Sequence, residues 1–174
     1  MIKSFNREII INSLIIDVAL ISILFVLPTI SHILPFPIYL LDPMRLVVFI
    51  GYLLYRNKLN AYFLAVFIPI FSMFTTGHPP GIKAVLIAIE LLVNIVLFIH
   101  LYKTILLNPI IAIIIAILVS KVVYYSFKYS LLITGVIEGG LISTSFKFQL
   151  VVSLLLSIAV GVAFHFKTRR DGDK

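Results

Sequence analysis

The chain has 174 residues, of which 61% are hydrophobic and 12% are charged, and its mean hydropathy is +1.18. A soluble domain of this length cannot bury so much apolar surface, so the composition predicts an all-α integral membrane protein and excludes a separate soluble catalytic domain. The net charge of +7 is expected in cytoplasmic loops and tails rather than at a nucleic-acid interface, and the absence of cysteine excludes disulfides and thiolate chemistry.

Six apolar runs follow one another along the chain, each near the ~20 residues that a helix needs to cross a bilayer. The predicted spans are residues 9–30, 38–55, 60–75, 82–101, 106–127 and 148–166. They form a six-transmembrane-helix bundle in one domain, residues 1–174. The first run is longer than a signal-peptide core and has no small-x-small cleavage pattern after it, so we expect it to be retained.

Prolines refine the boundaries of three spans. Asp42-Pro43 is typical of an N-cap followed by the first helical residue, and a helix that starts there has only about 20 Å before Arg56. Residues 36–41 would then enter the membrane as non-helical chain, which is tolerated only against protein or a water-filled cavity. Pro69 is expected to kink the third span, and Asn108-Pro109 predicts the start of the fifth.

Basic residues set the orientation. With the N-terminus inside, only three lysines lie at the edges of outer segments, Lys83, Lys128 and Lys147. The cytoplasmic segments hold nine basic residues: Lys3, Arg7, Arg56, Lys58, Lys103, Lys167, Arg169, Arg170 and Lys174. The excess of basic residues in the cytoplasmic segments, nine against three, predicts that both termini are cytoplasmic.

The fourth and fifth spans carry polar stripes. Lys83, Glu90 and Asn94 lie on one side of the fourth helix, within about 60° of one another. The second stripe, on the fifth span, comprises Lys121, Tyr124, Tyr125 and Lys128. Because these helices run in opposite directions, Glu90 and Lys121 are predicted to lie at the same depth, roughly 10 Å below the outer ends of the stripes.

Two interpretations of this pair remain open. Glu90 and Lys121 either neutralise each other and brace the bundle, or line a substrate cavity open to the outside, since ionisable groups within membranes are functional by default. Tyrosines beside them offer amphipathic surface for a small ligand. If Glu90 offsets Lys121, then Lys83 and Lys128 leave an excess of positive charge, which predicts an anionic or zwitterionic ligand.

The other polar residues of the spans carry weaker signals. Ser153 and Ser157 have the spacing of helix-packing contacts, whereas Gln149, near the outer end of the sixth span, is a candidate ligand contact. Asp42 and Arg45 are expected to form a local cap and ion pair. Asp17 has no evident partner and is predicted to face another subunit or a polar spot inside the bundle.

No catalytic or metal-binding motif joins the candidate residues. The four histidines have no metal-ligand spacing, and no nucleophile elbow, phosphate-binding glycine loop or pair of catalytic carboxylates is present. The sequence therefore predicts neither an enzyme nor a cofactor or metal site.

A local pattern resembles the substrate-binding S components of energy-coupling factor (ECF) transporters, over about residues 42–98. The matching residues are Asp42-Pro43-Met44-Arg45, Asn60-Ala61-Tyr62, Pro69, Thr76-Gly77-His78-Pro79, Lys83, Glu90-Leu91 and Asn94. Elsewhere only the topology is similar, and the Ala-x-x-x-Ala that many S components carry in span one is not present.

The resemblance implies a bacterial multi-pass cell-membrane protein that captures a vitamin-like molecule from outside. A transmembrane T subunit and two ATPase subunits would be its partners in import. In that family the ligand lies near the outer face, among spans four to six and the first, third and fifth loops. Those places hold Phe36, Tyr39, His78, Lys83, Glu90, Asn94, Lys121, Tyr125, Lys128, Glu138 and Gln149.

The alternative is the rod-shape-determining membrane protein family (MreD-like), which has a similar size and span count. Such a protein would be a scaffold without a ligand. A channel is disfavoured, because no ring of polar residues recurs through the depth of any span.

Overall fold

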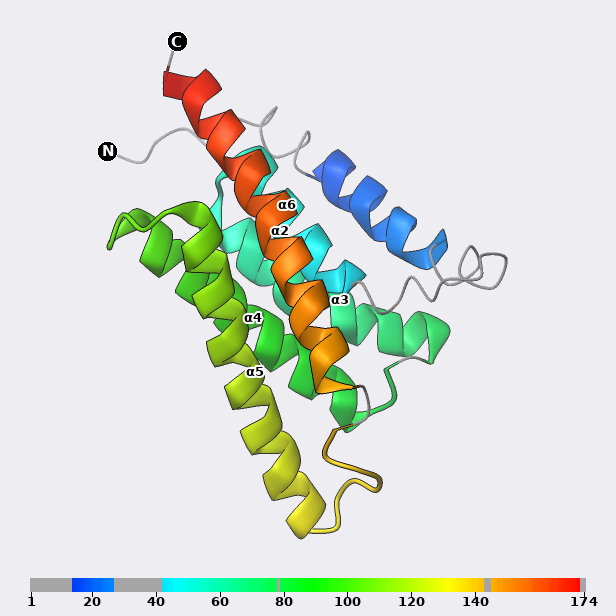
Figure 1. The fold of residues 1–174 in the computed structure, drawn as a ribbon. Helices are drawn as coiled ribbons and strands as arrows, with labels where there is room; N and C mark the ends of the chain where they lie inside the picture. Colours follow the sequence, from blue (N-terminus) through cyan, green and yellow to red (C-terminus); the bar gives the residue numbers. More distant parts are fainter. Residues whose placement is uncertain (1–13, 27–41, 78, 143–144, 173–174) are drawn as a thin grey trace, which may run out of the picture.

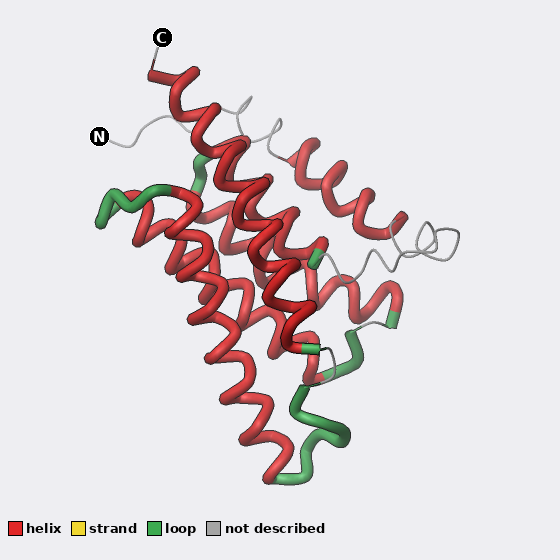
Figure 2. Tube along the Cα trace, viewed as in Figure 1, coloured by secondary structure: helices red, strands yellow, loops and turns green. Residues whose placement is uncertain are grey.

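The computed structural model describes residues 14–26, 42–77, 79–142 and 145–172, and every regular element in these ranges is an α-helix (Figures 1 and 2). The helices are Leu14–Val26, α2 (Pro43–Tyr55), α3 (Lys58–Thr76), α4 (Ile82–Lys103), α5 (Pro109–Ile133) and α6 (Phe146–Gly172). Four of them, α3 to α6, are long and apolar enough to cross a membrane, whereas Leu14–Val26 and α2 are shorter apolar helices. The fold is therefore that of an all-α membrane bundle.

The bundle is built around α4, which packs against α3 on one side and α5 on the other. α6 packs on α5 and α2, and α2 also packs on α3 and α4, so the shorter helix contacts three longer ones (Figure 1). Small side chains such as Ala61, Ala112 and Ala116 are fully buried and let the helix backbones approach closely.

An aromatic cluster fills the core between α2, α4 and α6. The ring of Phe98 meets those of Phe49 and Phe164 edge to face, with centroids 5.2 and 5.0 Å apart, and the ring of Tyr52 stacks on Phe164. Edge-to-face pairs stabilise a core beyond the area that they bury. This cluster lies toward the end of the bundle where α2 and α4 finish.

Local signals place several helix ends where the sequence predicted them. α5 begins at Pro109, and the Asn108 side chain accepts a hydrogen bond from the Ile110 backbone N–H at 2.9 Å, so that prediction is confirmed. α2 begins at Pro43 as predicted, but Asp42 does not cap it with its side chain. Its carboxylate pairs with Arg45 at 2.8 Å instead, so the predicted ion pair is confirmed and the predicted cap is wrong.

Two boundaries differ from the predicted ones by more than two residues. α5 continues to Ile133 rather than ending at 127, and it stops only before Gly135, at φ 70°. Within this extension, Ser126 and Ser130 donate their hydroxyls to the backbone carbonyls four residues before them, so these polar groups are satisfied inside the helix. α6 reaches Gly172 rather than 166, since charged residues continue a helix as readily as apolar ones. Pro69 lies inside α3, and its predicted kink stays a prediction.

Candidate functional site

Glu90 lies at the centre of a buried charge network formed by Asp42, Arg45, Glu90 and Lys121. It projects from α4, and its Oε1 atom accepts a hydrogen bond from Arg45 Nη2 of α2 and pairs with Lys121 Nζ of α5 at 3.0 Å. Arg45 Nη1 pairs in turn with Asp42 Oδ2 at 2.8 Å. One carboxylate thus joins three helices.

The network is buried at its centre and open at its two ends. The side chains of Arg45 and Glu90 are 2% and 6% exposed, whereas those of Asp42 and Lys121 are 30% and 26% exposed. Two cations face two anions, so the formal charges cancel. An uncompensated charge at this depth would be costly, which explains why each buried group has a partner of opposite sign.

The predicted contact between Glu90 and Lys121 is confirmed, whereas the part played by Arg45 was missed. Arg45 was assigned to a local ion pair, and the structure shows that its guanidinium also reaches across to Glu90. A signal for this contact was present, because an arginine in an apolar helix needs a buried acceptor and Glu90 is an in-span carboxylate. Lys121 Nζ also lies 5.9 Å from the centre of the Tyr124 ring.

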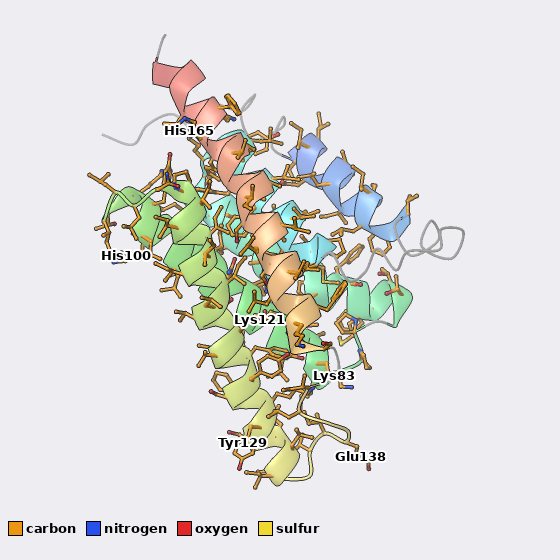
Figure 3. All side chains as sticks on the ribbon, in the orientation of Figure 1. Lys83, His100, Lys121, Tyr129, Glu138 and His165 are labelled. Atoms are coloured by element: carbon orange, nitrogen blue, oxygen red, sulfur yellow. The ribbon has the colours of Figure 1, made fainter. Side chains whose placement is uncertain are left out.

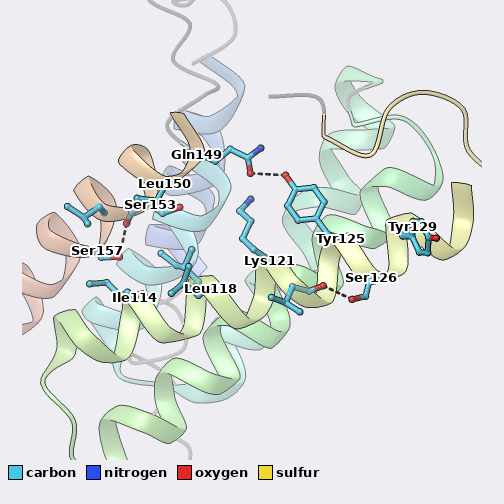
Figure 4. A pocket seen from close by; sticks show the side chains of 13 residues that line it. Ile114, Leu118, Lys121, Tyr125, Ser126, Tyr129, Gln149, Leu150, Ser153 and Ser157 are labelled. Carbon is cyan, nitrogen blue, oxygen red and sulfur yellow. Dashed lines mark hydrogen bonds between the residues drawn. The ribbon is translucent and has the colours of Figure 1, made fainter. Parts of the chain in front are cut away.

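A cavity of about 620 Å³ opens between α5 and α6, beside Lys121 (Figure 4). We call it the α5–α6 groove. Tyr125 and Gln149 join the two helices across it through a 2.8 Å hydrogen bond from the tyrosine hydroxyl to the Gln149 side chain. The lining residues are Ile114, Ile117, Leu118, Lys121, Val122, Tyr125, Ser126, Tyr129, Gln149, Leu150, Ser153, Leu154 and Ser157.

Three predicted site residues, Lys121, Tyr125 and Gln149, therefore meet at one cavity. Its volume lies within the ~300–1,000 Å³ that drug-sized ligands occupy. Apolar walls with a few convergent polar groups are typical of small-molecule sites. The arrangement can hold an apolar body and bind a polar group at one place, while the binding roles of these residues stay predictions.

The side chains of Asn94 and Lys128 do not line the groove, because they form hydrogen bonds with other parts of the chain. Asn94 is 1% exposed, and its amide donates to Ser120 Oγ at 3.2 Å, which joins α4 to α5. Lys128 is 7% exposed and donates to the carbonyl oxygen of Leu141 at 2.8 Å. Ser120 was not predicted, because a single serine in an apolar run gives no signal of its partner.

Two further candidates, Lys83 and Glu138, lie at the end of the bundle where α5 finishes. Lys83 is half-buried in the first turn of α4, and Glu138 is exposed in the chain that follows α5 (Figure 3). Phe36, Tyr39 and His78 lie outside the described residues, so the part of the predicted site that rests on them is not described.

Asp17 has a partner within the chain. It is 5% exposed on the helix Leu14–Val26 and accepts a hydrogen bond from the Asn60 amide of α3 at 3.1 Å. Of the two environments that the sequence left open, the structure shows the polar spot inside the bundle.

Over the described ranges, no group of three His, Asp or Glu side chains is arranged to hold a metal ion. That the chain is not an enzyme and needs no cofactor stays a prediction. Comparison with protein-family models, curated proteins and solved structures gives no match, so the function must be argued from the residues themselves.

Proposed function

We propose that this chain is the substrate-capturing membrane subunit of an ECF-type uptake system in the bacterial cell membrane. It crosses the membrane six times with both termini in the cytoplasm, and it binds a small anionic or zwitterionic molecule from outside. Import is driven by a separate T subunit and two ATPase subunits, because the sequence contains no nucleotide-binding motif.

The observation that carries the proposal is the position of Lys121. Its ammonium group pairs with buried Glu90 on one side and lines the α5–α6 groove on the other. Ionisable groups at membrane depth are costly and usually belong to substrate or ion pathways. Because this cation reaches a cavity of ligand size, its position favours solute binding over a purely structural role.

The residues of the groove have distinct tasks in this proposal. Lys121 attracts the negative group of the ligand, while Tyr125 and Gln149 offer a hydroxyl and an amide beside it. Leucine and isoleucine walls cover the apolar part and exclude water. Arg45 keeps Glu90 in place when Lys121 turns toward a ligand, since it contacts the same carboxylate oxygen.

The test is reconstitution with and without an energy-coupling module. We expect the purified chain to retain a small molecule that mass spectrometry detects, and to accumulate that molecule in proteoliposomes only when T and ATPase subunits and ATP are present. ATP-dependent uptake by this chain alone would contradict the proposal.

A second candidate function, an MreD-like scaffold, is favoured by one feature. The formal charges of the network cancel within the chain, so the four side chains need no ligand for charge balance. A scaffold would co-purify with cell-wall synthesis proteins and without a small molecule, and filling the groove would not alter its assembly.

A further inference from the structure

Lys121 lies at the middle of α5 rather than at its end. Twelve residues separate it from Pro109 (121 − 109) and twelve from Ile133 (133 − 121), which places it about 18 Å from either end of the helix. A group that contacts its ammonium must therefore descend well below the surface of the membrane.

The ammonium group of Lys121 has hydrogen-bond donors that its pair with Glu90 does not use. It can donate three hydrogen bonds, and the pair with Glu90 at 3.0 Å uses one of them. The side chain lines the groove and is 26% exposed. A carboxylate or similar anion in the groove would form charge-assisted hydrogen bonds with it, whereas a neutral ligand would gain much less.

The part of the groove toward the start of α5 is apolar. Ile114 and Leu118 line it from α5, and Leu154 lines it from α6. Ser157 adds no free donor, since its hydroxyl donates to the Ser153 carbonyl oxygen at 2.7 Å. From Lys121 to Ile114 is seven residues, about 10 Å along the helix, which is room for a ring system or a short chain.

The rim of the groove faces the region of lipid chains. Leu118 is 53% exposed, Val122 is 66% exposed and Leu154 is 46% exposed, and all three lie within the apolar spans. Exposed leucine and valine at this depth contact acyl chains rather than water. A ligand with an apolar body can therefore enter sideways, from the bilayer.

We propose that the α5–α6 groove binds a membrane-soluble organic acid, with one anionic group at Lys121 and a compact apolar body between Ile114, Leu118 and Leu154. A phospholipid is a poor occupant, because its anionic headgroup stays at the surface of the membrane, whereas Lys121 is predicted to lie roughly 10 Å below the outer ends of the stripes. The inference deepens the proposed function, and it rests on that function only in treating the acid as cargo.

The test uses 1-pyrenebutyrate and its uncharged analogue 1-pyrenebutanol as probes. Fluorescence anisotropy is measured with the full chain in phosphatidylcholine nanodiscs, against empty discs. We expect the acid to bind at least tenfold more tightly than the alcohol. This preference should disappear in Lys121→Met and persist in Lys121→Arg, which keeps the charge.

Variants that fill the α5–α6 groove test whether the acid binds there. Ser153→Phe fills the groove from α6, and Leu118→Trp covers it from the exposed rim of α5, where a large side chain is tolerated. Both should lose at least tenfold in affinity for the acid. The matched control is Val151→Phe, since Val151 is 54% exposed on α6 and does not line the groove, and it should bind as the wild type does.

Three outcomes would overturn the inference. The first is equal binding of the acid and the alcohol. The second is wild-type binding by both groove-filling variants. The third is loss of binding when the discs contain phosphatidylglycerol, which would assign the groove to lipid. The binding assay contains no ATPase, so it tests the site independently of transport. Acid binding without partner-dependent uptake would contradict the transport function but support the binding site. Partner-dependent uptake without acid binding would reject only the site.

Discussion

Arg45 and Lys121 contact the same carboxylate oxygen of Glu90, but they are not equivalent. Arg45 is almost fully buried and pairs with both Asp42 and Glu90, whereas Lys121 is partly exposed and pairs with Glu90. Loss of Arg45 therefore leaves Glu90 paired only with the partly exposed Lys121, whereas loss of Lys121 leaves it paired with the buried Arg45.

We predict that Arg45→Met destabilises the fold more than Lys121→Met. Breaking a buried ion pair by removal of one partner typically costs about 3–5 kcal/mol, and a partly exposed pair contributes about 1 kcal/mol or less. Thermal unfolding in detergent micelles measures the difference as a larger loss of Tm for Arg45→Met.

The double variant Arg45→Met/Glu90→Leu is the control for stranded charge. It removes both buried ions and leaves Asp42 and Lys121, whose opposite charges still cancel and whose side chains are partly exposed. Replacing a buried pair with apolar residues is often neutral, so most of the lost stability should return. If the double variant is less stable than Arg45→Met, the network is not held by charge compensation.

Helical pitch was sufficient to predict part of the site. Glu90 and Lys121 lie on stripes of consecutive helices, and consecutive helices usually pack together, so their depth and their contact follow from spacing. The contact of Arg45 with Glu90 joins residues 45 positions apart on helices that are not consecutive, and periodicity carries no information about it. The groove could not be predicted either, because its width depends on how α6 lies on α5.

At the scale of elements, α5 and α6 approach each other closely near the start of α5. A Cβ atom at Gly161 would lie 2.4 Å from Ile110 Cγ1 and 3.0 Å from Ile110 Cα, so glycine is needed for this approach. At Gly51 of α2, an added Cβ would meet Leu64 Cδ1 at 2.6 Å, which is the free end of a flexible side chain.

We predict that Gly161→Ala lowers the thermal stability and Gly51→Ala lowers it less. Backbone atoms of Ile110 cannot move without shifting α5, whereas the Leu64 side chain can rotate, and overpacking of a rigid site costs about 1–3 kcal/mol. Unfolding monitored by circular dichroism compares the two variants. An equal loss of Tm would show that the two helices have room to separate at Gly161.

A polar contact and an aromatic contact join the helix Leu14–Val26 to α3. Asn60 donates to Asp17 at 3.1 Å, and the rings of Phe25 and Phe71 meet edge to face at 5.4 Å. We predict that Asp17→Leu raises hydrogen exchange in residues 14–26 and leaves α4 and α5 unchanged. Ser22→Ala is the control, since Ser22 donates to the Val18 carbonyl of its own helix. Unchanged exchange in Asp17→Leu would mean that apolar packing alone holds this helix.

The positions of the long helices were predicted well because their boundaries carry local signals. Proline and asparagine mark the start of α5, and glycine at φ 69° marks the end of α3. The ends of α5 and α6 were predicted too early, since hydropathy falls there while helix propensity does not. Six crossings remain a proposal, because two of the apolar helices are shorter than a span requires over the residues that the structure describes.

At the scale of the whole molecule, basic groups gather at one end of the bundle. Arg56 donates to Thr168 at 3.1 Å, and Lys167 donates to the Leu54 carbonyl oxygen at 2.9 Å, so the ends of α2 and α6 are joined. The connection from α4 to α5 lies at this end, whereas the chain between α5 and α6 lies at the other (Figures 1 and 2).

We predict that these two connections lie on opposite sides of the cell membrane. The chain has no cysteine, so single substitutions can be labelled without background. Glu138→Cys should react with a membrane-impermeant maleimide on intact cells, and Thr104→Cys should react only after permeabilisation, as the basic bias requires. The reverse pattern of labelling would refute the orientation.

Close packing at Gly161 and the bonds at Thr168 and Lys167 give the bundle a fixed end, with consequences for its motion. Gln149 lies twelve residues from Gly161 (161 − 149), about 18 Å along α6, so a bend of roughly 10° in α6 at Gly161 moves it about 3 Å while the end that carries Lys167 and Thr168 keeps its bonds. A hydrogen bond between membrane helices contributes ~0.6 kcal/mol on average, close to thermal energy, so the Tyr125–Gln149 bond by itself is a weak restraint on that bend. Helix motions of this kind occur in microseconds to milliseconds. Bending of α6 at Gly161 would therefore change the width of the groove near Gln149.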